Sequence, residues 1–142
     1  MTIAPPGRQV VSIKRLALPG LLAGLIAAVC TVAVAAIARA LGIGLEVQSE
    51  PIPLPAFALW CLVGSGIGIV LAWLLRNRRR FIIVAAIGTV LSLIPPIAFP
   101  DDIATKAVLV ATHLIAAAIV IPILGRRFTP SAASPLTQEE HA

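Results

Sequence analysis

The chain alternates between long apolar runs and short clusters of charged residues. The runs without Asp, Glu, Lys or Arg are Leu16–Ala38, Pro51–Leu75, Phe81–Pro100 and Ala107–Gly125. A bilayer core of about 30 Å needs about 20 helical residues at about 1.5 Å each, so each run is long enough to cross it. The apolar residues within a run are continuous, as in Phe81–Ile87, whereas the strands of a membrane barrel would alternate apolar and polar residues. The pattern therefore predicts four transmembrane helices.

The expected fold class is an all-α, polytopic membrane protein: a four-transmembrane-helix bundle with both termini cytoplasmic. We place the helices at residues 16–40, 55–75, 81–99 and 103–124, inside one transmembrane domain over 16–125. Residues 1–15 are expected to form a cytoplasmic N-terminal tail. Residues 126–142 are expected to be a disordered cytoplasmic C-terminal tail, because they are rich in Pro, Ser and charge. Pro51, Pro53 and Pro55 favour an extended, polyproline-like approach to the second helix.

The composition supports a membrane location. Hydrophobic residues make up 59% of the chain and charged residues 12%, and the mean hydropathy is +1.03. Average soluble domains are about 45–50% apolar and about 25% charged, and disordered chains contain still fewer apolar residues. Two cysteines cannot staple a small secreted scaffold. Soluble, disordered and disulfide-stapled classes are therefore excluded.

The distribution of Lys and Arg predicts the orientation. On one side of the membrane lie Arg8, Lys14, Arg15, Arg76, Arg78, Arg79, Arg80, Arg126 and Arg127, and on the other lie Arg39 and Lys106. Cytoplasmic loops carry the excess of Lys and Arg, so the first side is expected to be the cytoplasm of a bacterial plasma (inner) membrane. We interpret Arg76, Arg78, Arg79 and Arg80 as a topology determinant that attracts anionic lipid headgroups, with no nucleic-acid partner.

Small residues recur four positions apart along the predicted helices. Gly20 and Gly24 lie in the first helix, and Gly64 and Gly68 lie in the second. Such stripes let helices approach closely in lipid, where packing and hydrogen bonds drive association. We interpret them as packing seams within one chain, and an interface between copies or with a membrane protein partner remains an alternative.

One basic side chain lies deep in a predicted helix. His113 is about 11 residues from either end of its helix, and an ionisable residue at that depth is a candidate functional site. Lys106 lies seven residues earlier on nearly the same face. Asp101 and Asp102 precede that helix and could form a polar path with Lys106 towards His113, or simply cap the helix. For His113 itself the alternative is a neutral histidine bonded to a backbone carbonyl.

Arg39 lies at the outer end of the first predicted helix. Its long side chain is expected to reach the interface and pair with Glu46, Glu50 or an Asp of the second outer connection. Capture of a lipid phosphate is the functional alternative.

The segment around the fourth helix resembles a known family. Pro95-Pro96, Pro100-Asp101-Asp102, Ala104-Thr105-Lys106, Thr112-His113-Leu114 and Pro122 resemble the pattern of an uncharacterised family of small four-span integral membrane proteins from high-GC Gram-positive bacteria, a domain-of-unknown-function family. The resemblance spans roughly residues 15–127. It implies fold and location, and it marks Asp101, Asp102 and His113 as positions of interest without giving them a role.

The sequence carries no P-loop, nucleophile elbow, zinc-protease or dinucleotide motif, so we predict no enzymatic activity and no cofactor. The leading hypothesis is a non-enzymatic accessory or scaffold subunit of the plasma membrane. The alternative is a homo-oligomeric small transporter or channel in which His113 faces a central cavity. A lipid-modifying enzyme using Asp101 and Asp102 is disfavoured, because His113 lies too far along the helix to pair with them.

Overall fold

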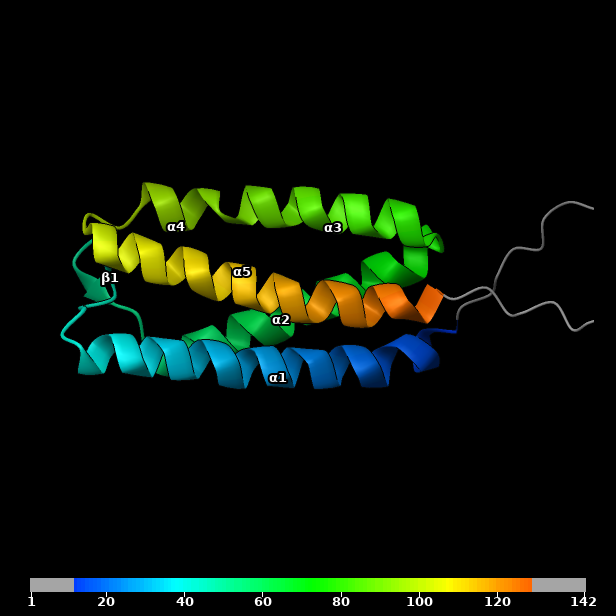
Figure 1. The fold of residues 1–142 in the computed structure, drawn as a ribbon, viewed down its shortest axis with the longest axis horizontal. Coiled ribbons are helices and arrows are strands. Elements are labelled where there is room, and N and C mark those ends of the chain that lie inside the picture. The colour runs from blue at the N-terminus through cyan, green and yellow to red at the C-terminus, as the bar shows by residue number, and fades with distance from the viewer. Residues whose placement is uncertain (1–11, 129–142) are drawn as a thin grey trace, which may run out of the picture.

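The computed structural model describes residues 12–128, and the expectations for the outer parts of both tails lie outside this range. Four helical segments are long and apolar enough to cross a membrane: Ile13–Ala40, Leu54–Leu75, Arg78–Ala98 and Ile103–Phe128. They run alternately up and down the long axis of the molecule (Figure 1). The predicted fold class, an all-α bundle of four transmembrane helices, is confirmed.

Local residues explain where several helices begin. Helix α1 covers Ile13–Ala40, α2 covers Leu54–Leu75 and α5 covers Ile103–Gly125, which continues into the short 3-10 turn η1 at Arg126–Phe128. Pro55 lies in the first turn of α2, where no backbone N–H donor is needed. Asn77 caps the next helix by accepting a hydrogen bond from the Arg80 backbone N–H at 3.1 Å.

The third crossing is built from two helical pieces, where the sequence suggested one. Helix α3 covers Arg78–Ser92, α4 covers Ile94–Ala98, and Leu93 separates them. The break has a direct cause, because Pro95 and Pro96 have no N–H group to donate to the carbonyls four residues earlier, and their rings crowd those carbonyls.

The connection between α1 and α2 forms a small β-hairpin. Strand β1 covers Glu46–Val47 and β2 covers Glu50–Pro51, paired antiparallel with Glu46 opposite Pro51. Gln48 and Ser49 form the turn with φ of 52° and 64°, as a tight hairpin turn requires at both central positions. The sequence did not predict this hairpin. The extended approach to the second helix that it predicted is found at Pro53, with φ of −65° and ψ of 139°, whereas Pro55 already lies in α2.

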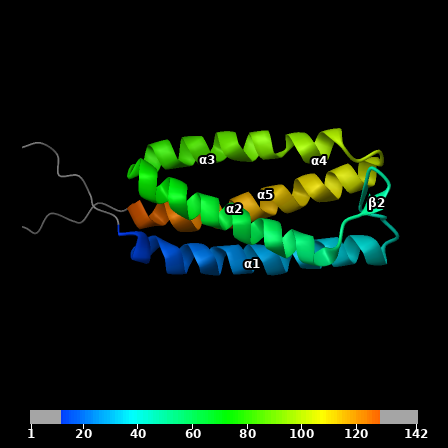
Figure 2. The same cartoon turned by 180° about the vertical axis from the view of Figure 1, so that it is seen from behind.

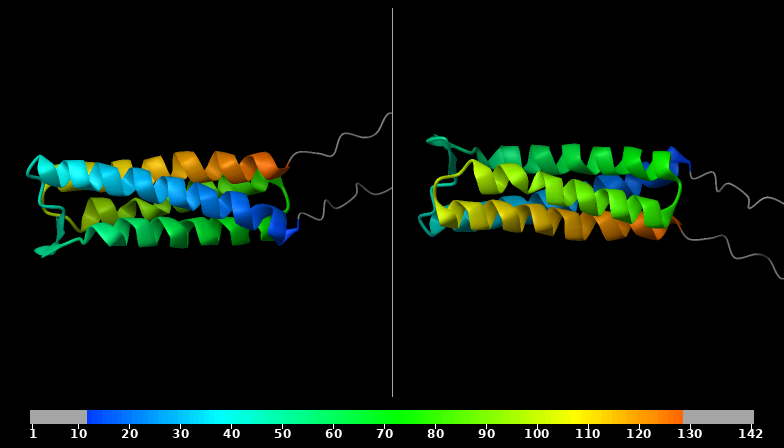
Figure 3. Two further views of the ribbon diagram at one scale, coloured as in Figure 1. Left: turned by 90° about the horizontal axis from the view of Figure 1, so that it is seen from below. Right: turned by 90° about the horizontal axis from the view of Figure 1, so that it is seen from above.

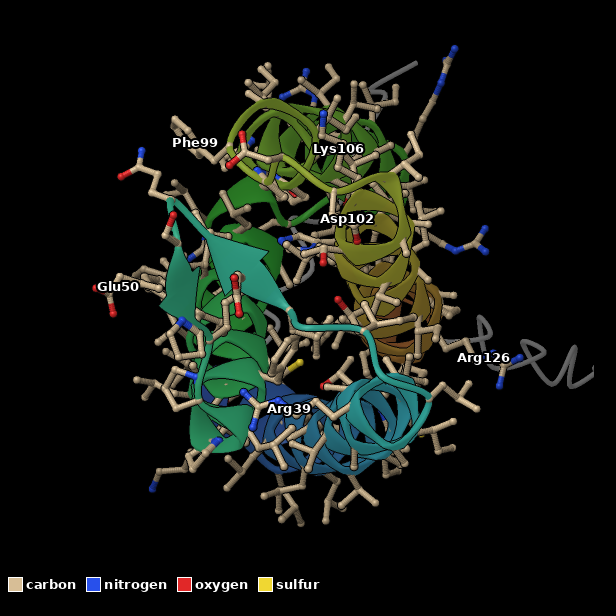
Figure 4. The ribbon with its side chains drawn as sticks, turned by 90° about the vertical axis from the view of Figure 1, so that its left-hand side faces the viewer. Arg39, Glu50, Phe99, Asp102, Lys106 and Arg126 are labelled. Carbon is tan, nitrogen blue, oxygen red and sulfur yellow. The ribbon has the colours of Figure 1, made fainter. Side chains whose placement is uncertain are left out.

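The helices form a four-cornered bundle when viewed from its hairpin end (Figure 4). Helix α1 packs along α2 and α5, while the α3–α4 arm lies on the opposite side of the bundle (Figures 1 and 3). The apolar core is divided into two clusters. One comprises Leu16, Ala72, Phe81, Leu124 and Phe128, and the other comprises Ala35, Ala38, Leu45, Phe57 and Leu109.

The first cluster lies where the described termini and the α2–α3 turn gather at one end of the bundle, and the hairpin and the α4–α5 turn lie at the other (Figure 1). The large apolar side chains on the outside are exposed, including Val29, Leu74 and Ile103. A surface of this kind suits lipid and not water.

Candidate functional site

A groove opens between α2 and the α3–α4 arm. The two leave the Arg76–Asn77 turn together and diverge towards the hairpin end (Figure 2). The space between them has a volume of ≈ 760 Å³ and is floored by α5 and by Thr31 of α1. Its walls are mostly apolar, with Trp60 on α2 and Phe99 after α4 among them. Small-molecule sites have volumes of about 300–1,000 Å³ and similar linings, so the groove has the dimensions of a binding site.

Two of the groove walls carry glycine beside open space. An added Cβ at Gly64 on α2 or at Gly88 on α3 would meet no atom within 4 Å, and both residues line the groove. By contrast, a Cβ at Gly20 would lie 2.3 Å from Ile69 Cγ1, and one at Gly24 would lie 2.7 Å from Ser65 Cβ. Gly68 is intermediate, since its added Cβ would lie 3.1 Å from Leu124 Cδ1. Gly20 and Gly24 thus lie in a tight α1–α2 seam, whereas Gly64 borders open space.

The hydroxyl groups that line the groove already have acceptors for their hydrogens. Thr89 donates to the carbonyl oxygen of Ala85 at 2.9 Å, and Ser92 donates to that of Thr89 at 2.7 Å. Ser65 donates to the carbonyl oxygen of Gly20 on α1 at 2.5 Å. Because their hydrogens are already bonded, these hydroxyl groups are not free to donate to a molecule in the groove.

Thr31 closes the floor of the groove from α1. Its hydroxyl donates to the Ala28 carbonyl oxygen at 3.1 Å, and its Oγ1 lies 3.2 Å from Cys61 Sγ on α2. Thr31 is buried and Cys61 is half-buried, so this contact fastens the middle of α1 to the middle of α2.

His113 lies on the α5 wall of the groove. Its Nδ1 is 2.8 Å from the carbonyl oxygen of Leu109, and the Thr112 hydroxyl donates to the same oxygen at 2.8 Å. A carbonyl oxygen only accepts, so Nδ1 carries a proton and the opposite ring nitrogen, Nε2, is an acceptor in the neutral imidazole. Between residues 12 and 128 no partner is found for Nε2, and no fully buried side-chain N or O atom there is unpaired. Nε2 is therefore accessible.

Arg39, Asp102 and Lys106 lie near the ends of α1 and α5 at the hairpin end of the bundle (Figure 4). Within the described chain, the groove lining does not include Arg39, Asp101, Asp102 or Lys106. The structure therefore does not bring the suggested path from the two aspartates and Lys106 together with His113 in one cavity.

Asp102 caps α5. Its carboxylate accepts a hydrogen bond from the backbone N–H of Thr105 at 2.7 Å. That bond, with further backbone donors in the first turn, holds the pKa of Asp102 below its ordinary value. Over residues 12–128, no ion pair joins Asp102 to Lys106, and no hydrogen bond is made by the exposed side chain of Asp101.

Arg39 has a different partner from the one expected. Its Nη2 donates to the backbone carbonyl oxygen of Ile52, just after the hairpin. In the described part of the chain it makes no ion pair with Glu46, Glu50 or the aspartates, so the expectation of a carboxylate partner is wrong. A carbonyl satisfies one guanidinium donor and ties the end of α1 to the start of α2.

The arginine cluster lies at the opposite end of the bundle. Arg76 ends α2 in the left-handed conformation with φ of 47°, and Arg78, Arg79 and Arg80 form the exposed first turn of α3. Arg126 and Arg127 are exposed at the end of α5, on the same side (Figure 1). A basic ring of this kind suits an anionic membrane surface.

Comparison with known protein families gives a match over most of the chain. A family of unknown function, DUF6069, matches residues 11–130. The chain belongs to this family. The match covers all four membrane-spanning helices of the DUF6069 protein, and so agrees with the resemblance to an uncharacterised family. Neither a curated protein nor a solved structure matches the chain.

The sequence did not reveal the groove itself. Its walls are helical stripes of small and aromatic residues on α2 and α3, and such stripes occur equally in tightly packed seams. A groove wall differs from a tightly packed seam in the distance from each glycine to the side chains of neighbouring helices, and only the structure provides that distance.

Proposed function

We propose that this DUF6069 protein is a non-enzymatic accessory subunit of the bacterial plasma membrane that accepts an apolar molecule from the bilayer. The groove between α2 and the α3–α4 arm is the observation that carries the proposal. It lies among helices whose outer surfaces suit lipid, so an apolar molecule can enter it sideways without crossing water.

The proposed orientation places both termini and the Arg76–Arg80 turn in the cytoplasm. The support is that the basic ends of α1, α3 and α5 share one end of the bundle, while the hairpin end carries Glu46, Glu50, Asp101 and Asp102. Cytoplasmic ends carry the excess of Lys and Arg.

The position of His113 favours binding over the alternative of transport. A homo-oligomeric transporter or channel would need His113 at a cavity shared between copies. Here the histidine lines a groove within one bundle, beside Thr112 and Ala116 of the same helix. Binding in this groove requires no second copy.

Two tryptophans on α2 provide the test. Trp60 lines the groove, whereas Trp73 is not part of its lining, and the chain has no other Trp. Trp73→Phe thus leaves a reporter on the groove lining, and Trp60→Phe leaves a reporter outside it. Each protein is placed in phosphatidylcholine nanodiscs and titrated with bromododecane, because a bromine atom quenches nearby indole fluorescence.

We expect saturable quenching of Trp60 and only linear quenching of Trp73. Saturation indicates a site with finite capacity, whereas linear quenching reports probe dissolved in the surrounding lipid. Linear quenching of both tryptophans would overturn the proposed function, because the groove would then hold only bulk lipid.

A further inference from the structure

We propose that the groove selects apolar molecules whose head group donates a hydrogen bond, such as a lipophilic alcohol or phenol, and that His113 Nε2 accepts this bond. The inference rests on the proposed function and adds the chemical class of the ligand. It comes from an inventory of the donors and acceptors on the groove wall.

Protein donors are scarce in the groove. The hydroxyls of Thr31, Ser65, Thr89, Ser92 and Thr112 each donate to a backbone carbonyl. Nδ1 of His113 is also engaged, at the Leu109 carbonyl oxygen. Among the side chains that line the groove, this leaves the indole N–H of Trp60 as the donor without a partner in the described chain. On the α5 wall, a ligand head that can only accept hydrogen bonds, such as an ether or ester, therefore finds no free side-chain donor among the described residues.

Hydrogen-bond acceptors are available on the groove wall, and Nε2 of His113 is one of them. The hydroxyl oxygens keep lone pairs that can accept a hydrogen bond. The ring nitrogen Nε2 of His113 also carries a lone pair, and it has no partner in the described chain. The Leu109 carbonyl, which accepts from both Thr112 and His113, fixes the imidazole orientation and leaves Nε2 exposed. Leaving such a group without a partner in an apolar setting is unfavourable, so a ligand donor gains affinity there.

The shape of the groove leaves room for a tail. It extends from Phe81 and Ile121 near the basic end to Phe99 and Ile52 near the hairpin end, and His113 lies on its α5 wall. A head group at His113 can therefore be continued by an apolar chain along the groove. Apolar side chains on the groove lining, among them Trp60, Val84 and Ala117, would contact that chain.

The experiment compares two probes that differ only in the phenolic hydrogen, which a methyl group replaces in the ether. A dodecyl bromophenol and its methyl ether are titrated into the Trp73→Phe protein in phosphatidylcholine nanodiscs, with Trp60 quenching as the readout. We expect the phenol to bind about three- to tenfold more tightly than the ether, the preference that one net hydrogen bond provides. His113→Leu is expected to remove the preference. Thr89→Val, the matched control on the facing wall, is expected to keep it.

The outcomes are separable. Saturable but equal binding of phenol and ether by the protein that retains His113 would overturn the selection by His113 and leave the groove function intact. Tighter binding of the ether would also overturn it, because the groove would then favour a ligand that only accepts hydrogen bonds. A preference for the phenol that survives in folded His113→Leu protein would assign the acceptor to another group and overturn the role of His113.

Linear quenching with both probes would overturn the proposed function itself. The comparison of the two probes on one protein needs no variant at His113, so misfolding of His113→Leu does not prevent a decision.

Discussion

Ser65 on α2 donates its hydroxyl hydrogen to the carbonyl oxygen of Gly20 on α1 across 2.5 Å. The bond passes between two helices whose backbones approach closely at Gly20 and Gly24. Most other hydroxyls in the described helices bond within their own helix, so this contact is one of the few that specify which faces of α1 and α2 meet.

Loss of that bond should weaken the bundle modestly. We expect Ser65→Ala to lower the free energy of unfolding by about 0.6 kcal/mol and by at most about 1.7 kcal/mol, the range for hydrogen bonds between membrane helices. Reversible unfolding in mixed micelles measures the change. Ser92→Ala is the control, because Ser92 is exposed and bonds to Thr89 of its own helix. Equal losses in both variants would contradict a special role for the bond between helices.

A single methyl group should separate packing glycines from groove glycines. Gly24→Ala places a Cβ 2.7 Å from Ser65 Cβ, so α1 and α2 must move apart. We expect a loss of about 1–3 kcal/mol, the usual result of overpacking. Gly64→Ala, where the new Cβ meets no atom within 4 Å, is expected to be neutral or slightly stabilising. Detergent thermal unfolding compares the two, and a reversed order would mean that α1 and α2 pack differently.

Filling the groove should block it without unfolding the protein. A Cβ at Gly88 on α3 meets open space, so a leucine side chain there can occupy the cavity. We expect Gly88→Leu to abolish saturable quenching of Trp60 by bromododecane while the thermal unfolding midpoint stays near that of the parent protein. Val29→Leu, on the exposed outer face of α1, serves as the control. Unchanged quenching in Gly88→Leu would place the bound probe outside the groove.

The cap on α5 should make stability depend on acidity. The folded pKa of Asp102 is lowered by the Thr105 backbone N–H, so its contribution is complete above the unfolded value of 3.8 and is lost as the pH falls through the lower folded value. We expect Asp102→Asn, which can still cap, to reduce the acid-induced fall in the unfolding midpoint.

The neighbouring carboxylate is the control for that measurement. Asp101→Asn replaces by an amide an exposed carboxylate that makes no hydrogen bond within the described residues, so the unfolding midpoint of this variant should fall with acid as that of the parent protein does. Identical acid profiles for Asp102→Asn and the parent would show that the cap does not carry the effect.

The proposed topology predicts labelling from opposite sides. In a background with Cys30→Ala and Cys61→Ala, Ser49→Cys places a thiol in the exposed hairpin turn and Arg79→Cys places one in the exposed first turn of α3. A membrane-impermeant maleimide added to intact spheroplasts should label the first and not the second. Lysed cells supply the control, since both thiols should then react. Labelling of both sites in intact spheroplasts, or of Arg79→Cys alone, would overturn the orientation.

The number and type of the helices could be predicted because they depend on length and hydropathy alone. Four uncharged runs of bilayer length correspond to four helices. The cap by Asp102 was also one of two open alternatives, since an acidic residue before an apolar helix satisfies the free backbone donors. Each of these properties is local, so a single sequence suffices.

The features that depend on tertiary contacts could not be predicted. The hairpin lacks the usual Asn-Gly signal and instead places Gln48 and Ser49 at positive φ. Gly24 and Gly64 occupy equivalent positions in similar stripes, yet one lies in a tight seam and the other beside an open groove. Arg39 was expected to pair with a carboxylate, but the folded hairpin presents the Ile52 carbonyl to it.

The interruption at Leu93 bears on how the protein responds to its membrane. Because Pro95 and Pro96 interrupt the ladder of backbone hydrogen bonds, α4 can swing on α3 while the bonds on either side of the break stay intact. A helix of one piece would have to tilt as a whole when the surrounding bilayer is thinner or thicker than its apolar length. Here α4, which carries Pro96 on the groove lining, can adjust alone. We therefore expect the width of the groove, and with it the affinity for the proposed ligand, to differ between thin and thick bilayers.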